Sequence, residues 1–152
     1  MARVIVLDTS PLWLAASAVG KPPADACRAW IKAIEIAGYQ IVLPEICDYE
    51  VRREFLLRGA IAGIRRLDSL KATIDYQPIN TLTMLKAAEF WAHLRQGGLP
   101  TAGSRELDAD AILAAQTILA GQPGDTVTIA TTNVGHLSRF PGVDAQLWSA
   151  IS

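Results

Sequence analysis

The sequence has few of the residues that would support a disulfide framework, a histidine metal site or a membrane anchor. Its 152 residues include two cysteines and two histidines. Cys27 and Cys47 lack C-x-x-C spacing and fall in apolar helical patterns, which predicts buried, reduced thiols. No apolar run approaches the ~18 residues that cross a bilayer, and no signal-peptide pattern is visible. We therefore expect a cytoplasmic protein with no membrane association.

The chain also lacks a strong net charge. Its formal net charge is −1, so attraction to a nucleic acid has to come from a local patch. Basic residues outnumber acidic ones within residues 51–71, a pattern typical either of a solvated helix face or of a binding surface that includes Arg52 and Arg53. The 51% hydrophobic content and the mean hydropathy of +0.24 indicate apolar surface that a partner or a second copy covers.

The sequence alternates between strand and helix patterns over a length that suits one domain, residues 1–152. Strands separated by helices are typical of an α/β fold with a central parallel sheet flanked by helices. The two clearest loops are "GKPP" and "GGLPTAG". The patterns predict strands at 3–7, 39–43, 126–130 and 145–148, and helices at 11–18, 24–37, 44–58, 60–74, 80–96 and 108–120.

The first strand pattern ends in a carboxylate. In "VIVLDTSPLW" an unbroken aliphatic run, typical of a strand covered on both faces, stops at Asp8. The carboxyl ends of parallel strands form the edge where α/β sheets bind ligands. Asp8 alternatively caps a helix that starts at Pro11, as Thr9 and Ser10 also can.

The segment "PEICDYEVRREFLLRG" contains four acidic residues, and helical geometry separates them into two pairs. At about 100° per residue, Glu50 and Glu54 fall inside the apolar arc, whereas Glu45 and Asp48 fall outside it. A carboxylate on the core face needs a cation or strong donors. Glu50 is nearer the helix start and is the candidate for the crevice, while Glu54 alternatively reaches solvent and pairs with Arg58.

Two further segments carry oxygen-bearing side chains at corresponding places. In "LDADAILAAQ", Asp108 suits the N-cap and Asp110 the first helical turn, where the helix dipole alone would also favour an anion. In "TIATTNVGHL" an apolar strand ends in Thr131, Thr132 and Asn133, which is also typical of a simple polar turn.

Taken together, these residues predict a cluster of oxygen ligands at one edge of a parallel sheet. Asp8, Glu50 and Asp110 are hard ligands that suit Mg²⁺ or Mn²⁺ better than Zn²⁺. His93 lies in the middle of a predicted helix and His136 in a short turn, so neither favours a histidine site.

The pattern resembles the PIN-domain ribonucleases and, within them, the VapC-type toxins of toxin-antitoxin pairs. The resemblance covers essentially the whole chain. "VLDTSPL" is similar to the first acidic motif of that family, "LPEICDYEVRRE" to the second, "DADAILAAQ" to the third and "ATTNVGHL" to the fourth. The resemblance implies metal ligands at Asp8, Glu50 and Asp110, a fourth catalytic position at Asn133, and supporting residues at Thr9, Ser10, Asp108 and Thr131.

The resemblance also implies a PIN-like, Rossmann-like three-layer fold and an endoribonuclease that depends on Mg²⁺ or Mn²⁺. It implies an RNA substrate, a cognate antitoxin protein and a homodimer. This sequence departs from the family where many relatives have a fourth acid: Asn133 is neutral and His136 follows it, and Asp108 is an alternative source of that carboxylate.

Two other interpretations stay open. A phosphoryl-transfer protein of the haloacid dehalogenase type also begins with an apolar strand and an Asp, but it generally has a second Asp where this chain has Ser10. A catalytically weakened PIN-like module that binds RNA or protein is consistent with Asn133.

Overall fold

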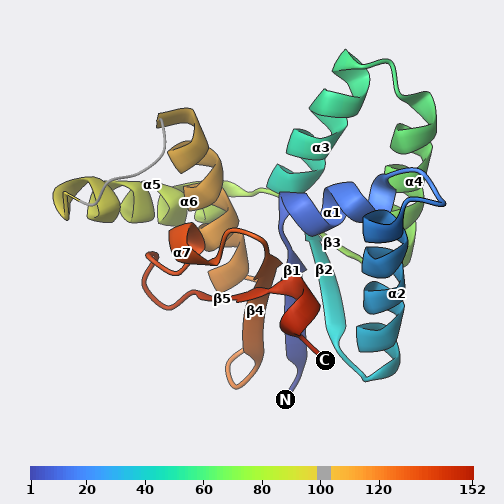
Figure 1. Ribbon diagram of the computed structural model, residues 1–152. Coiled ribbons are helices and arrows are strands. Elements are labelled where there is room, and N and C mark those ends of the chain that lie inside the picture. Colours follow the sequence, from blue (N-terminus) through green and yellow to red (C-terminus); the bar gives the residue numbers. More distant parts are fainter. Residues whose placement is uncertain (99–103) are drawn as a thin grey trace.

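The computed structural model describes residues 1–98 and 104–152 (Figure 1). Five strands form one sheet in the order β3-β2-β1-β4-β5, and every neighbouring pair is parallel. The predicted α/β fold with a central parallel sheet is therefore confirmed. The strands are β1 (Arg3–Leu7), β2 (Gln40–Pro44), β3 (Asp75–Gln77), β4 (Thr126–Thr131) and β5 (Asp144–Leu147). The helices are α1 (Thr9–Ala16), α2 (Pro22–Ile36), α3 (Glu45–Leu57), α4 (Ile61–Thr73), α5 (Thr81–Gln96), α6 (Ser104–Ile118) and α7 (Val134–Leu137), and a 3₁₀ turn, η1, spans Trp148–Ala150.

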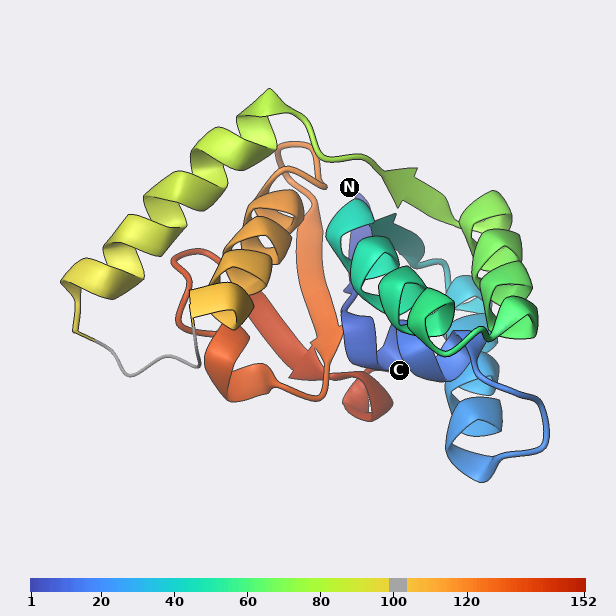
Figure 2. The same cartoon turned by 90° about the horizontal axis from the view of Figure 1, so that it is seen from above.

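The middle strand is buried on both faces, which gives the fold its three layers. Val4 and Val6 pack into a cluster with residues of α3, α5 and α6, whereas Ile5 and Leu7 pack with residues of α2. Successive residues of a strand point to opposite faces, so an unbroken apolar run is what this position requires. Figure 2 shows α5 outside α6, on the side of the sheet away from α2.

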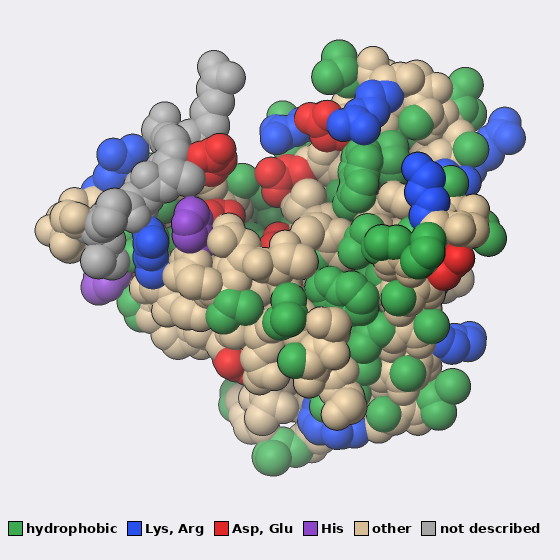
Figure 3. All heavy atoms as spheres, in the orientation of Figure 1, with side chains coloured by type: hydrophobic (Ala, Val, Ile, Leu, Met, Phe, Trp, Pro, Cys, Tyr) green, Lys and Arg blue, Asp and Glu red, His purple; other side chains and the backbone are tan. Residues whose placement is uncertain are grey.

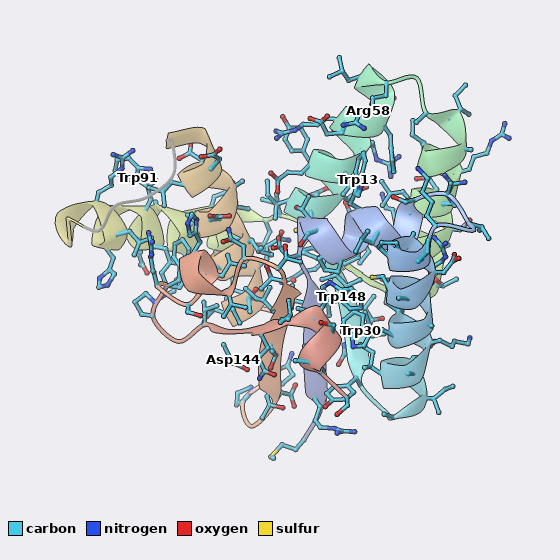
Figure 4. All side chains as sticks on the ribbon, in the orientation of Figure 1. Trp13, Trp30, Arg58, Trp91, Asp144 and Trp148 are labelled. Carbon is cyan, nitrogen blue, oxygen red and sulfur yellow. The ribbon has the colours of Figure 1, made fainter. Side chains whose placement is uncertain are left out.

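The second cluster is closed by the C-terminal segment. The ring centroids of Trp30 on α2 and Trp148 on η1 lie 5.3 Å apart (Figure 4). The indole Nε1 of Trp30 donates a 2.9 Å hydrogen bond to the backbone oxygen of Ile151. The end of the chain is thereby fixed over the β1–β4 part of the sheet.

The connectivity brings four segments to the carboxyl edge of the sheet. α1 follows β1, and α3 follows β2 without an intervening loop. β1 and β4 pair with Leu7 opposite Ala130, so Asp8 and Thr131 end up side by side. α6 leads into the start of β4 and therefore has its own beginning near the opposite, carboxyl edge.

Most predicted boundaries lie within two residues of the observed ones, and three differences matter for the fold and the site. β3 lies where the sequence predicted a connection, because its three residues are too few to show an alternating pattern. α1 begins at Thr9 and not at Pro11, since Asp8 caps it. α6 begins at Ser104, four residues before Asp108, so the predicted N-cap role of Asp108 is wrong. The predicted loop spans residues 97–103, of which 99–103 lie outside the described residues.

The described residues contain no helix that combines the length and the apolar character needed to span a bilayer.

Candidate active site

Asp8 is held at the end of β1 by three hydrogen bonds. Its backbone N–H donates to the oxygen of Ala130 at 3.0 Å, which extends the β1–β4 ladder by one residue. Its Oδ1 accepts from the N–H of Thr9 at 2.7 Å and caps α1. Its Oδ2 accepts from the hydroxyl of Thr131 at 2.6 Å. Asp8 therefore caps α1 through Oδ1, as the alternative interpretation predicted, while its Oδ2 is bonded to Thr131.

Thr131 connects Asp8 to the turn after β4. Its side chain is fully buried, and its Oγ1 also accepts the N–H of Asn133 at 2.7 Å. The next residue, Thr132, donates from its hydroxyl to Ser10 at 2.9 Å. The turn after β4 is thus tied to the turn after β1 by two hydroxyl contacts, which fixes the carboxylate of Asp8 in one orientation.

Asn133 begins α7 but does not cap it with its side chain. The residue is exposed, and its side chain has no hydrogen bond to another described residue. The structure places Asn133 at the carboxyl edge of the sheet through its backbone. No hydrogen bond joins its side-chain amide to Asp8, Glu50 or Asp110 among the described residues.

Glu50 faces the same edge from α3. The hydroxyl of Thr9 donates to its Oε1 at 2.8 Å, and Nη2 of Arg53 lies 3.7 Å from its Oε2. Burial raises the pKa of Glu50, and the contacts with Thr9 and Arg53 only partly oppose that effect. Glu54 is half exposed and lies 4.0 Å from Arg58, as the alternative interpretation predicted.

Asp110 completes the group from α6. Its pKa is raised to about 7, first by burial and then by the negative charges of Asp8, Glu50 and Glu106. Burial likewise raises the pKa of Asp8, and the hydrogen bonds from Thr131 and Thr9 oppose it. The charge of Asp8 therefore disfavours the charged forms of Glu50 and Asp110, and the charge of Glu50 adds to the effect on Asp110.

Glu106 is a member of this electrostatic group that the sequence did not single out. It precedes Asp110 by four positions, one helical turn, on α6. The pattern "DADAILAAQ" predicts a helix that starts at Asp108, which leaves Glu106 in the preceding loop. Asp108 itself is exposed and lines a groove with Trp91 and Ile112, between α5 and α6.

Asp48 was expected outside the apolar arc of α3, and this expectation is wrong. Its exposed fraction is 5%, and it accepts two hydrogen bonds from Arg52, at 2.9 and 3.1 Å. The hydroxyl of Tyr76 donates to it at 3.2 Å, and Arg52 also pairs with Asp68 at 2.7 Å. α4 and β3 cover this side of α3, which a single-helix projection cannot show.

The two cysteines are buried and unpaired with each other, as predicted. Cys47 lies beside the carboxylates, with its Sγ 4.0 Å from Oδ1 of Asp8. Burial raises the pKa of the Cys47 thiol well above its ordinary value, and the charges of Asp8, Glu50 and Asp110 raise it further. Cys47 therefore lines the site as an uncharged thiol.

Acidic side chains gather in the hollow between the α3 and α6 parts of the surface (Figure 3). Among residues 1–98 and 104–152, no three Asp, Glu, His or Cys side chains stand close enough together to hold a metal ion as arranged. The donor set nevertheless suits a hard divalent cation, because it consists of carboxylates with threonine hydroxyls beside them. A cation would also relieve the repulsion that raises the pKa of Asp110.

Several solved structures superpose on this chain over nearly its whole length. A chain of VapBC2 from Rickettsia felis, bound to a DNA fragment from its promoter, superposes with a TM-score of 0.67 at 16% identity, over 95% of this chain and 98% of that chain. A chain of FitAcB from Neisseria gonorrhoeae gives 0.67 at 19% identity, over 97% and 99%. DNA-bound VapBC from Salmonella typhimurium gives 0.60 at 17% identity, over 97% and 99%.

These likenesses confirm the predicted PIN-like, three-layer fold and the structural resemblance to the VapBC complexes. No protein-family model matches the sequence, and no curated protein matches it.

Proposed function

We propose that this protein is an endoribonuclease that depends on Mg²⁺ or Mn²⁺ and acts as the toxin of a toxin-antitoxin pair. One observation carries the proposal. Asp8, Glu50 and Asp110 come from three elements remote in sequence and converge at the carboxyl edge of one sheet. Burial raises the pKa of each, and the charges of Asp8 and Glu50 raise that of Asp110 further. Carboxylates with strongly perturbed pKa values in a hollow are typical of functional sites. The VapBC structures share this fold.

The chain's own residues position the reacting groups. Thr131 and the N–H of Thr9 hold the two oxygens of Asp8, and the hydroxyl of Thr9 holds Glu50. Without a cation, burial and the neighbouring negative charges raise the pKa of Asp110 to about 7, and a bound cation would favour its charged form. Cys47 excludes water from behind Asp8. Buried, pre-oriented carboxylates cost little reorganisation during the reaction.

Asp8, Glu50 and Asp110 would hold the divalent cation. When bound, Mg²⁺ or Mn²⁺ supplies a Lewis acid that lowers the pKa of an attacking water and neutralises charge on the scissile phosphate.

The two arginines predicted to bind substrate differ in their surroundings. Arg52 is engaged by Asp48 and Asp68, so its charge is already neutralised within the protein. Arg53 is half exposed beside Glu50 and can reach a phosphate next to the acids. We propose Arg53 as the phosphate-binding residue of the pair.

We also propose an antitoxin partner and a homodimer, and the exposed apolar surface supports both. α5 exposes Leu82, Met84, Leu85 and Trp91, next to the groove of about 360 Å³ that it forms with α6. A second cavity, of about 370 Å³, lies over Trp13 and Phe55 with Arg58 and Arg66 in its wall. Exposed apolar patches of this kind mark interaction sites. Size-exclusion chromatography with light scattering, with and without the product of a neighbouring small reading frame, tests both partners.

A second candidate is a PIN-like module that binds RNA or protein without cleaving it. The exposed Asn133 favours it, because this neutral side chain stands where a fourth acid is expected and no hydrogen bond joins it to the three carboxylates among the described residues.

A cleavage assay separates the two candidates. Purified protein is incubated with mixed cellular RNA in Mg²⁺ or Mn²⁺, with and without EDTA. The nuclease predicts RNA loss that EDTA abolishes and excess Mn²⁺ restores. RNA that survives in every metal condition while still binding the protein favours the non-cleaving module.

A further inference from the structure

Tyr49 is an exposed aromatic side chain directly beside the acidic site. It precedes Glu50 on α3, and its exposed fraction is 56%. No hydrogen bond joins its hydroxyl to another described residue, and it belongs to neither core cluster. Neither core packing nor a hydrogen bond among the described residues therefore accounts for a tyrosine at position 49.

Arg53 connects the Tyr49 ring to the carboxylate of Glu50. Its guanidinium carbon lies 5.1 Å from the ring centroid, and its Nη2 lies 3.7 Å from Oε2 of Glu50. Arg53 follows Tyr49 by four positions and Glu50 by three, so the three side chains share one flank of α3. The guanidinium group of Arg53 is therefore near both the Tyr49 ring and the Glu50 carboxylate.

We propose that Tyr49, with Arg53 beside it, is a stacking site for an RNA base next to the cleaved phosphate. This inference rests on the proposed nuclease function. It adds the class of ligand that binds beside the acidic site, which is an unpaired nucleobase. Unpaired bases of single-stranded RNA stack on exposed aromatic rings and on guanidinium planes.

The charges around Tyr49 favour this ligand. Three carboxylates alone repel a polyanion, and the guanidinium of Arg53 lies 3.7 Å from one of them, Glu50. A base held on a neutral ring adds attraction that does not depend on phosphate charge.

The test compares affinities for RNA with and without bases. In the Asp8→Asn background, which prevents cleavage, fluorescence anisotropy measures binding of a short oligoadenylate and of an abasic chain of equal length, in Mg²⁺. The ratio of the two affinities cancels the phosphate contacts. We expect Tyr49→Leu to reduce this ratio by about 5- to 100-fold, and Tyr49→Phe to keep it within about twofold, because stacking needs the ring and not the hydroxyl.

Tyr39→Leu is the matched control. Arg3 stacks on Tyr39 at 4.1 Å, but this pair lies before β2, at the opposite edge of the sheet. Its ratio should equal that of the unsubstituted background. An unchanged ratio in Tyr49→Leu overturns the stacking site, as does a ratio that falls equally in Tyr39→Leu. Cleavage by the protein with an intact Asp8, measured in parallel, decides the nuclease function separately.

Discussion

The hydroxyl of Thr131 donates a 2.6 Å hydrogen bond to Oδ2 of Asp8, across 123 positions of sequence. The same Thr131 oxygen accepts the N–H of Asn133 at 2.7 Å. One buried hydroxyl therefore joins the end of β1 to the turn after β4. Because Asp8 belongs to the carboxylate group, the orientation of that group depends on this hydrogen bond.

Replacing Thr131 with Val removes the hydroxyl and keeps the side-chain volume. We expect RNA cleavage to fall by about 10- to 100-fold, the usual cost of losing a residue that orients a metal ligand. The free energy of unfolding should fall by about 1–3 kcal/mol, because the N–H of Asn133 loses its acceptor and Oδ2 of Asp8 loses its donor. Thr128→Val is the control, since the hydroxyl of Thr128 bonds Asp144 away from the acids. Full activity in Thr131→Val would rule out this positioning role.

The raised pKa of Asp110 predicts how stability depends on pH in the metal-free protein. Its pKa is about 7 in the folded state and near its ordinary value of 3.8 in the unfolded chain. The folded state therefore binds more protons between these two values, and the resulting stabilisation is lost as pH rises through about 7. In EDTA, the melting temperature should fall from pH 6 to pH 8. Asp110→Asn should weaken this dependence; an identical slope in that variant would contradict the assignment.

Gln116 joins the two helices that carry Glu50 and Asp110. It is fully buried on α6, accepts the N–H of Ile46 at the start of α3 at 3.2 Å, and donates to the oxygen of Gln77 at 2.8 Å. Gln116→Leu leaves both backbone groups without partners, at about 1–3 kcal/mol for each group. Urea unfolding should show this loss. Gln146→Leu, a substitution of an exposed glutamine on β5, should change stability by less than about 0.5 kcal/mol. Equal stabilities of the two variants would argue against the link.

Substituting the adjacent residues Arg52 and Arg53 should affect different properties, stability for Arg52 and RNA binding for Arg53. Arg52→Gln removes the main cation from the buried Asp48, which predicts a lower melting temperature, since breaking a buried pair costs about 3–5 kcal/mol. Arg53→Gln should leave the melting temperature nearly unchanged and should weaken RNA binding, with a salt slope smaller by about one. Binding titrations across a salt series, together with thermal melts, measure both effects. The opposite assignment of phenotypes would refute this division of roles.

Residues at strand ends could be placed from the sequence, because strand burial and parallel topology together fix that edge. Asp8 and Thr131 followed apolar runs, and the structure joins them. Positions that depend on a neighbouring element could not be placed. Asp48 is buried by α4 and β3, and Glu106 joins the site because α6 starts earlier than the pattern "DADAILAAQ" showed. A helical projection describes one helix, whereas burial depends on everything packed against it.

We propose that Asp8, Glu50 and Asp110 form one metal-dependent nuclease site. The most direct test is RNA cleavage in Mn²⁺ by the Asp8→Asn variant, beside the unsubstituted protein at equal concentration, with circular dichroism to verify that both are folded. Asn keeps the size of the side chain and can still cap α1. We expect the unsubstituted protein to cleave RNA in a reaction that EDTA abolishes, and we expect no cleavage by Asp8→Asn. Undiminished, EDTA-sensitive cleavage by folded Asp8→Asn would contradict this proposal.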